Sequence, residues 1–159
     1  MYFYTTSTQQ NTNGTANTDT LLAAIQTVAA SHRARLVRFQ GGCYVAPTDN
    51  NFRLRVGFLT TLGTYAAGGA ITPTPSDSGA PAANVTASSL PTLGTGVFGA
   101  VPPINIAANI RNGFLWAALQ EDEKIGMNGA GPSLTASLIV NSQATVSSIP
   151  VNFKLVHQE

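Results

Sequence analysis

Hydrophobic and polar residues alternate in four stretches of the chain, which predicts four β-strands with one buried face each. Residues 53–58 place Leu54, Val56 and Phe58 on one side and Arg53 and Arg55 on the other. The other stretches are residues 104–111, 134–140 and 149–156, with apolar positions at Ile104, Ile106, Ala108 and Ile110, at Leu134, Ala136, Leu138 and Val140, and at Ile149, Val151, Phe153 and Leu155. Successive strand side chains point to opposite faces, so this period of two places one face in a core. Such strands, separated by turn residues, predict an all-β antiparallel sandwich or barrel.

Residues 19–30 fit two structures. Leu21, Leu22, Ile25 and Val28 have the spacing of an apolar helix face, and Asp19 is placed to cap its first turn. The stretch continues directly into strand-like sequence, so a strand is equally compatible with it. The pattern leaves helix and strand open here.

Two further segments lack regular alternation. Residues 1–18 are rich in Thr, Asn and Gln and open with Tyr2, Phe3 and Tyr4. We predict an extended N-terminal arm or loose strand, followed by one sandwich domain of residues 19–159. Residues 65–99 are dense in Gly, Pro, Ser and Thr, which predicts a long mid-chain loop, and such loops are usually functional.

The arm is predicted to dock on a neighbouring subunit, and the loop to pack on a neighbouring subunit or on the sheet of its own subunit, because neither segment has an obvious way to pack by itself. Three adjacent aromatic side chains at the start of the arm are expected to be covered by a partner, because exposing them to solvent would forgo the stabilisation that their burial gives. The expected contact residues are Tyr2, Phe3 and Tyr4 of the arm and Thr72, Pro73, Pro75 and Pro81 of the loop.

Charged residues make up only 9% of the 159 residues, whereas hydrophobic residues make up 43%. Soluble proteins usually carry ~25% charged residues, which keep a free monomer in solution. A surface with so few charges suggests that copies or partners cover much of it. The net charge is +1 and the densest basic patch is Arg33, Arg35 and Arg38. Nucleic acid is therefore not expected as the main ligand, because neutralising phosphates takes a stripe of Lys and Arg.

The first residues, MYFYTTSTQQ, have neither the basic nor the apolar region of a secretory signal. No apolar run approaches the ~18 residues of a transmembrane helix. We therefore expect a protein that is assembled in the cytoplasm where it is made, without a membrane partner.

A search for chemistry predicts no catalytic, cofactor-binding or metal-binding residue. The single cysteine, Cys43, lies in an apolar stretch and is expected to be a small buried hydrophobe. His32 and His157 have no second ligand at a metal-binding spacing and are expected at the surface or at an interface. The acidic run of residues 121–123 lacks the pattern of a calcium loop and is expected to form a solvated turn between two strands. We therefore expect a protein that is not an enzyme and has no cofactor.

Trp116 has two interpretations. It shares a predicted strand face with Phe114, which favours packing in a core or an interface. The alternative is an exposed platform on which a sugar stacks.

The order of the segments resembles a group of small bacteriophage virion proteins. The matching pieces are DTLLAAIQTVAASHRARLVRFQ, then NFRLRVGFLTT, then GGAITPTP with GAPAA shortly after it, then GFLWAAL with an acidic turn, and finally SIPVNFKLVHQE. The group typically carries a GGTAVTP-x-P…PAA motif in a long central loop. The resemblance covers most of residues 19–159, and the N-terminal arm has no match.

The resemblance implies a single jelly-roll or related β-sandwich in the virion. It further implies an auxiliary capsid protein, of the cement or decoration type, that forms oligomers, often trimers, and clamps the major capsid protein. No functional residue transfers, because the group has no catalytic site. Alternative interpretations are a jelly-roll coat protein or a tail or fibre component of the same particle. A carbohydrate-binding β-sandwich, with aromatic side chains aligned on one face, is the alternative from another class.

Overall fold

A computed structural model describes residues 1–12, 15, 18–29, 31–43, 50–89, 91–92, 94–109, 111–128, 137–144 and 149–159. These residues form fourteen β-strands and one short 3-10 helix. The strands are β1 Phe3–Asn11, β2 Thr20–Thr27, β3 Arg33–Cys43, β4 Asn51–Gly57, β5 Leu59–Thr61, β6 Gly69–Ile71, β7 Thr74–Pro75, β8 Val85–Ser89, β9 Val97–Phe98, β10 Ile104–Asn109, β11 Phe114–Ala117, β12 Ile125–Asn128, β13 Ser137–Ala144 and β14 Pro150–Gln158, and the helix η1 is Glu121–Glu123.

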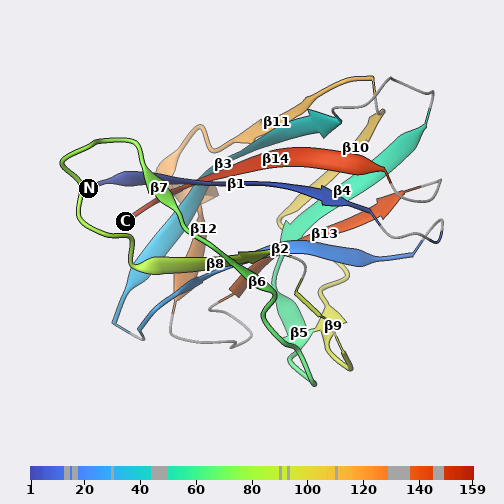
Figure 1. The fold of residues 1–159 in the computed structure, drawn as a ribbon, viewed down its shortest axis with the longest axis horizontal. Coiled ribbons are helices and arrows are strands. Elements are labelled where there is room, and N and C mark those ends of the chain that lie inside the picture. The colour runs from blue at the N-terminus through green and yellow to red at the C-terminus, as the bar shows by residue number, and fades with distance from the viewer. Residues whose placement is uncertain are drawn as a thin grey trace.

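Two six-stranded antiparallel sheets make up most of this structure (Figure 1). Sheet A has the order β11-β3-β14-β1-β7, with β12 also paired to β3. Sheet B has the order β10-β4-β13-β2-β8-β6. The two strands β5 and β9 form a separate small sheet, which projects below the sandwich in Figure 1. The all-β sandwich predicted from the alternating pattern is confirmed.

The core lies between the two sheets. Sheet A contributes Leu36 and Phe39, and sheet B contributes Leu54 and Val56, all fully buried. Four phenylalanines meet at one end of this core. The ring of Phe39 lies 4.9 Å from that of Phe114 and 6.1 Å from that of Phe153, and Phe52 lies 6.1 Å from Phe114. Burying each such side chain stabilises the fold by about 1.5–3 kcal/mol.

The predicted apolar faces point into this core. Leu54 and Val56 of β4 and Ile104 of β10 are buried, as are Leu138 and Val140 of β13. In the last strand, Ile149, Val151, Phe153 and Leu155 are all buried. Phe58 lies beyond the end of β4 and is only half-buried against the core. Ile110, Leu134 and Ala136 lie outside the described residues.

Residues 19–30, whose sequence fitted a helix or a strand, contain the strand β2. β2 is buried on both faces: Leu22 and Ile25 face the main core, whereas Leu21 and Ala24 pack with a second cluster. That cluster includes Leu59, Phe98 and Ile139, so the β5–β9 lobe covers the outside of sheet B. A strand covered on both faces is apolar throughout, which is why its sequence also fitted a helix.

Of the two structures predicted for the N-terminal segment, an extended arm or a strand, residues 3–11 adopt the strand. They form β1, which pairs with β14 from Phe3↔Gln158 to Asn11↔Pro150. Tyr4 and Thr6 on its inner side are buried. The Thr- and Gln-rich sequence offers few apolar side chains for a core. Backbone pairing with one edge of β14 and the burial of Tyr4 and Thr6 nevertheless hold it in sheet A.

The predicted mid-chain loop is also more ordered than expected. Residues 65–99 contain the short strands β6, β7, β8 and β9. β8 extends sheet B beside β2, and β6 pairs with β8. The chain then crosses to sheet A, where β7 pairs with β1. The segment thus closes one open side of the sandwich, at the left of Figure 1.

Two glycines provide a matched test of this packing. A Cβ at Gly41 of β3 would collide with the Asn152 carbonyl oxygen and lie 2.8 Å from the Cα of Phe153. A Cβ at Gly126 of the neighbouring β12 would have no atom within 4 Å. We predict that Gly41→Ala lowers the free energy of unfolding by about 1–3 kcal/mol, because backbone must move. Gly126→Ala should leave it unchanged or raise it by ~0.5–1 kcal/mol. Urea unfolding of both variants checks this, and equal effects would contradict the packing around Gly41.

Candidate interaction surface

The two segments predicted to make contacts meet at one end of the sandwich. β7 pairs with β1, with Tyr4 opposite Pro75 and Thr5 opposite Thr74. The Ser76 N–H donates to the Phe3 carbonyl at 2.8 Å, and the Tyr4 hydroxyl donates to the Pro81 carbonyl at 2.9 Å. Both chain ends lie here as well, because Tyr2 and Glu159 exchange two backbone hydrogen bonds of 3.0 and 2.9 Å. The N-terminal aromatics therefore hold the chain's own loop.

Tyr4 is not available to a partner, which corrects its predicted role. Only 1% of it is exposed, and its ring stacks on that of His157 with the centroids 5.5 Å apart. Burial raises the pKa of the Tyr4 hydroxyl, and the nearby Glu159 carboxylate raises it further. Tyr2 and Phe3, by contrast, are 39% and 41% exposed. The sequence could not distinguish the three, since only the pairing register decides which aromatic faces inward.

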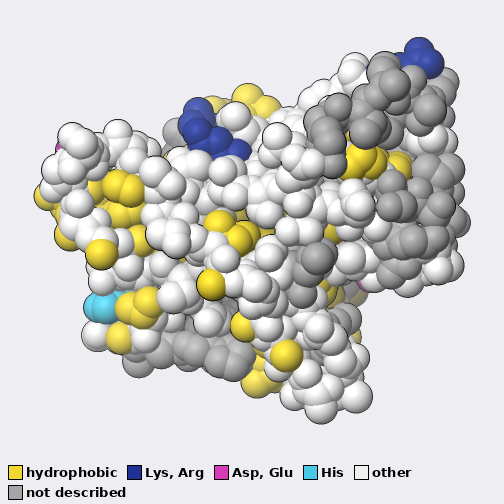
Figure 2. All heavy atoms as spheres, in the orientation of Figure 1, with side chains coloured by type: hydrophobic (Ala, Val, Ile, Leu, Met, Phe, Trp, Pro, Cys, Tyr) yellow, Lys and Arg dark blue, Asp and Glu magenta, His cyan; other side chains and the backbone are white. Residues whose placement is uncertain are grey.

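The four predicted loop residues lie around one apolar hollow, called here the loop hollow. Its volume is about 520 Å³. Its lining is uncharged throughout and consists of Ala70, Ile71, Thr72, Pro73, Pro75, Ala80, Pro81, Ala82, Ala83, Val85, Thr86 and Ala87. Figure 2 shows hydrophobic side chains gathered at this end of the molecule, whereas the visible face carries few charged ones. The structure thus brings Thr72, Pro73, Pro75 and Pro81 together, as a surface rather than as a free loop.

A second groove, called here the Phe3 groove, crosses the outer face of sheet A. It has a volume of about 350 Å³ and is lined by Phe3, Val37, Arg38, Ser76, Ala117 and Val156. A register shift creates it: Val156 pairs with Arg38 and His157 with Leu36, so Val37 has no partner on β14. Bulges of this kind redirect side chains. Sequence analysis missed this groove, because its residues come from five separate segments.

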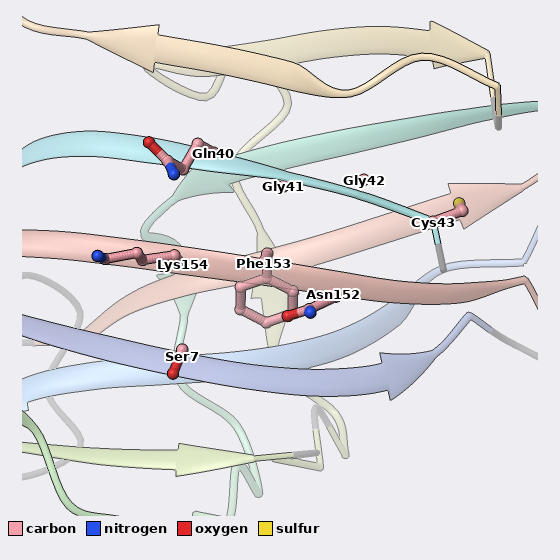
Figure 3. Close-up of a pocket in the computed structure, with 8 residues that line it drawn as sticks. All are labelled: Ser7, Gln40, Gly41, Gly42, Cys43, Asn152, Phe153 and Lys154. Carbon is pink, nitrogen blue, oxygen red and sulfur yellow. The ribbon is translucent and has the colours of Figure 1, made fainter. Parts of the chain in front are cut away.

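A third hollow, about 420 Å³ in volume, has a partly polar lining and lies at the middle of sheet A (Figure 3). Its lining comes from three adjacent strands: Ser7 of β1, Gln40, Gly41, Gly42 and Cys43 of β3, and Asn152, Phe153 and Lys154 of β14. Hydroxyl, amide and ammonium groups surround it, and no carboxylate is among them. Burial raises the pKa of the Cys43 thiol to about 11, so the thiol stays protonated and is a poor nucleophile at neutral pH.

The acidic run forms the turn that was predicted. η1 connects β11 to β12 with all three residues exposed. Glu121 forms ion pairs with Arg35, at 3.2 Å, and with Lys124. These contacts, above all the hydrogen bond from Lys124, lower the pKa of Glu121. Among the described residues, no group of three or more His, Cys, Asp or Glu is placed to hold a metal ion.

Trp116 packs as the first of its two interpretations predicted. Phe114 is buried and Trp116 is half-buried against the main core. Trp116 also lines a hollow of about 430 Å³, together with Pro103, Ala117, Leu119, Glu123 and Ile125.

His157 is buried, which corrects its predicted place at the surface or at an interface. Its Nε2 lies 3.2 Å from Glu159 Oε1, while Glu159 Oε2 accepts the Asn84 N–H at 2.7 Å. Nδ1 is buried without a described partner. Burial lowers the pKa of His157, and the Glu159 carboxylate opposes this only in part. This network fastens the part of residues 65–99 that directly precedes β8 to the end of β14.

Comparison with known proteins identifies no relative: no family model, no curated protein and no solved structure matches the chain. Within the described residues, no helix is long and apolar enough to cross a membrane.

The buried histidine predicts a stability that depends on pH. The folded pKa of His157 lies below its ordinary value of 6.5, so below that pH the unfolded chain binds the proton more readily than the folded chain does. This contribution to stability is complete above pH 6.5 and is lost as the pH falls toward the folded pKa. The loss has a limiting slope of about 1.4 kcal/mol per pH unit.

His157→Phe keeps a ring beside Tyr4 but does not titrate. Between pH 7.5 and 5.5, wild-type protein should lose more unfolding free energy than the variant, as measured by urea titration at each pH. Parallel pH profiles of the two proteins would show that another group is responsible.

Proposed function

We propose that this protein is a structural component of a bacteriophage particle, acting as an auxiliary capsid protein rather than as an enzyme. In this role it associates with copies of itself and with the major capsid protein. The protein is assembled into the capsid in the host cytoplasm and is then part of the virion. A trimer is the form implied by the resemblance to phage virion proteins.

The connectivity of the sandwich carries the proposal. The pairs β1–β14, β2–β13, β3 with β11 and β12, and β4–β10 are nested one inside the next along the chain. The nested pairs are joined into sheets by β14–β3 in sheet A and by β13–β4 in sheet B, and the short strands β7, β8 and β6 extend the two sheets at their edges. This nesting supports the proposal that the sandwich is a jelly roll, a long antiparallel ribbon rolled on itself, which is a fold of viral capsid proteins and of lectins. Fold alone does not define function, so the surface has to support the choice.

The surface favours association over catalysis or nucleic-acid binding. Charged residues make up 9% of the chain, and the loop hollow has an uncharged lining. Prolines at positions 73 and 75 lie at this side of the sandwich, where they discourage uncontrolled strand pairing. Contacts through such a surface are individually weak. Repeated over a closed shell, they add up to strong attachment by multivalency.

The loop hollow provides the test of capsid binding. Ala82→Arg places an unpaired charge in the apolar lining, which costs more than ~1.4 kcal/mol when a partner covers it. We predict at least about tenfold weaker co-sedimentation with purified phage shells. The matched control is Val97→Arg, at a residue that is 50% exposed on the β5–β9 lobe and should bind as wild type. Equal binding by all three proteins would exclude the loop hollow as the contact, and failure of wild-type protein to bind shells would overturn the proposed function.

Copy number separates the related roles. A coat protein of the same particle would be present in hundreds of copies that form the shell itself, and a tail or fibre component in few. Quantitative mass spectrometry of purified particles distinguishes both from an auxiliary protein whose number matches the capsid lattice.

Carbohydrate binding is the second candidate, and the partly polar hollow in Figure 3 favours it. Ser7, Gln40, Asn152 and Lys154 provide hydrogen-bonding groups of the kinds that hold sugar hydroxyls. Trp116, the stacking platform considered in the sequence, is half-buried and lines a different hollow. A glycan array tests this candidate: binding should be lost in Gln40→Ala and Asn152→Ala and kept in Trp116→Phe, and an array without any bound glycan would exclude it.

A further inference from the structure

The Phe3 groove lies beside a turn that carries an exposed leucine and an exposed aspartate. The groove is an apolar depression in which the only charged residue is Arg38. Leu119, which is 87% exposed, projects from the turn that follows β11. The two features lie side by side, because Ala117 lines the groove and the Ala118 N–H donates to the Val37 carbonyl at 3.0 Å. An exposed leucine, called here the knob, which also lines the hollow beside Trp116, therefore neighbours an apolar groove, called here the hole.

The knob is held in place before any partner arrives. The Glu123 carboxylate accepts the Leu119 N–H at 2.6 Å and the Gln120 N–H at 3.3 Å. Glu121 is anchored by Arg35 and Lys124. Since the turn is already fixed, ordering it on binding costs little conformational entropy, which favours association.

The charges on this face are complementary between copies. Asp122, next to the knob, and Arg38, in the hole, are both exposed. Within the described part of the chain, neither forms an ion pair. The other carboxylates of the turn are used internally, Glu121 by Arg35 and Lys124 and Glu123 by backbone amides. An apolar knob with one free negative charge thus lies beside an apolar hole with one free positive charge.

We propose that a second copy of this chain binds here through a two-fold contact. Leu119 of each copy enters the Phe3 groove of the other, and Asp122 of each copy approaches Arg38 of the other. A two-fold axis requires a patch that complements itself, and a knob next to a hole meets this requirement because both pairs then form at once. The inference rests on the self-association in the proposed function and specifies a dimer as its unit, in place of the trimer that the resemblance implies.

Charge reversal tests the contact in solution without shells, so its outcome is independent of capsid binding. Arg38→Asp alone and Asp122→Arg alone each place like charges together at both symmetric sites. Each variant should dissociate the dimer at least about tenfold more readily in sedimentation equilibrium. The double variant R38D/D122R restores opposite charges and should dimerise as wild type does. An equimolar mixture of the two single variants should form a one-to-one heterodimer.

Leu119→Ser removes the knob without disturbing the core, since the side chain is exposed, and should give a monomer with an unchanged far-UV circular dichroism spectrum. Val97→Ser, at an exposed residue of the β5–β9 lobe, is the matched control and should remain a dimer. A wild-type protein that is monomeric or trimeric, or a double variant that stays dissociated, would overturn the contact. A monomer that binds shells would contradict the two-fold contact but support the proposed function. A dimer that does not bind shells would support the contact and contradict the proposed function.

Discussion

The pairing of β14 on both of its edges is the constraint on which the rest of the structure depends. β14 pairs with β1 along one edge and with β3 along the other, while Val151, Phe153 and Leu155 fill the core below it. The C-terminal strand β14 therefore lies in the middle of sheet A and holds the N-terminal strand β1 beside it. The same strand carries His157, which stacks on Tyr4 and contacts Glu159. Tyr4 in turn donates a hydrogen bond to the Pro81 carbonyl, and Glu159 accepts one from the Asn84 N–H, so both contacts hold the loop segment.

The interaction surfaces follow from this arrangement. Because β1 lies beside β14, Phe3 reaches the outer face of sheet A, where the unpaired Val37 of β3 completes a groove. Because β7 pairs with β1, the prolines of the loop segment are held over a hollow rather than released into solvent. A chain with few charges thus presents apolar depressions on a rigid body. That combination suits repeated, geometrically defined contacts better than diffuse electrostatic binding.

Much of the fold was predictable because alternation reports directly on which side of a strand is buried. The strands around Leu54, Ile104 and Phe153 were recognised in this way. β2 was ambiguous because it is covered on both faces and has no polar side. For β1 the sequence left an arm or a strand open because its Thr and Gln side chains are polar, although backbone hydrogen bonds to β14 hold the strand regardless of side-chain type. The predicted loop contacts lie together on one surface, whereas Tyr4 and His157 proved to be interior residues.

The sequence by itself determined the all-β class, the low content of charged residues and the two segments in which intersubunit contacts were predicted. These properties depend on composition and on neighbours one or two residues apart, which any reader of the chain can see. Only the tertiary structure decided the nesting of the strands, the inward direction of Tyr4, and the meeting of Phe3, Val37, Ala117 and Val156 in one groove. Those features depend on register between strands far apart in the chain. A shift of one residue would turn each side chain to the opposite face, and no local pattern fixes that choice.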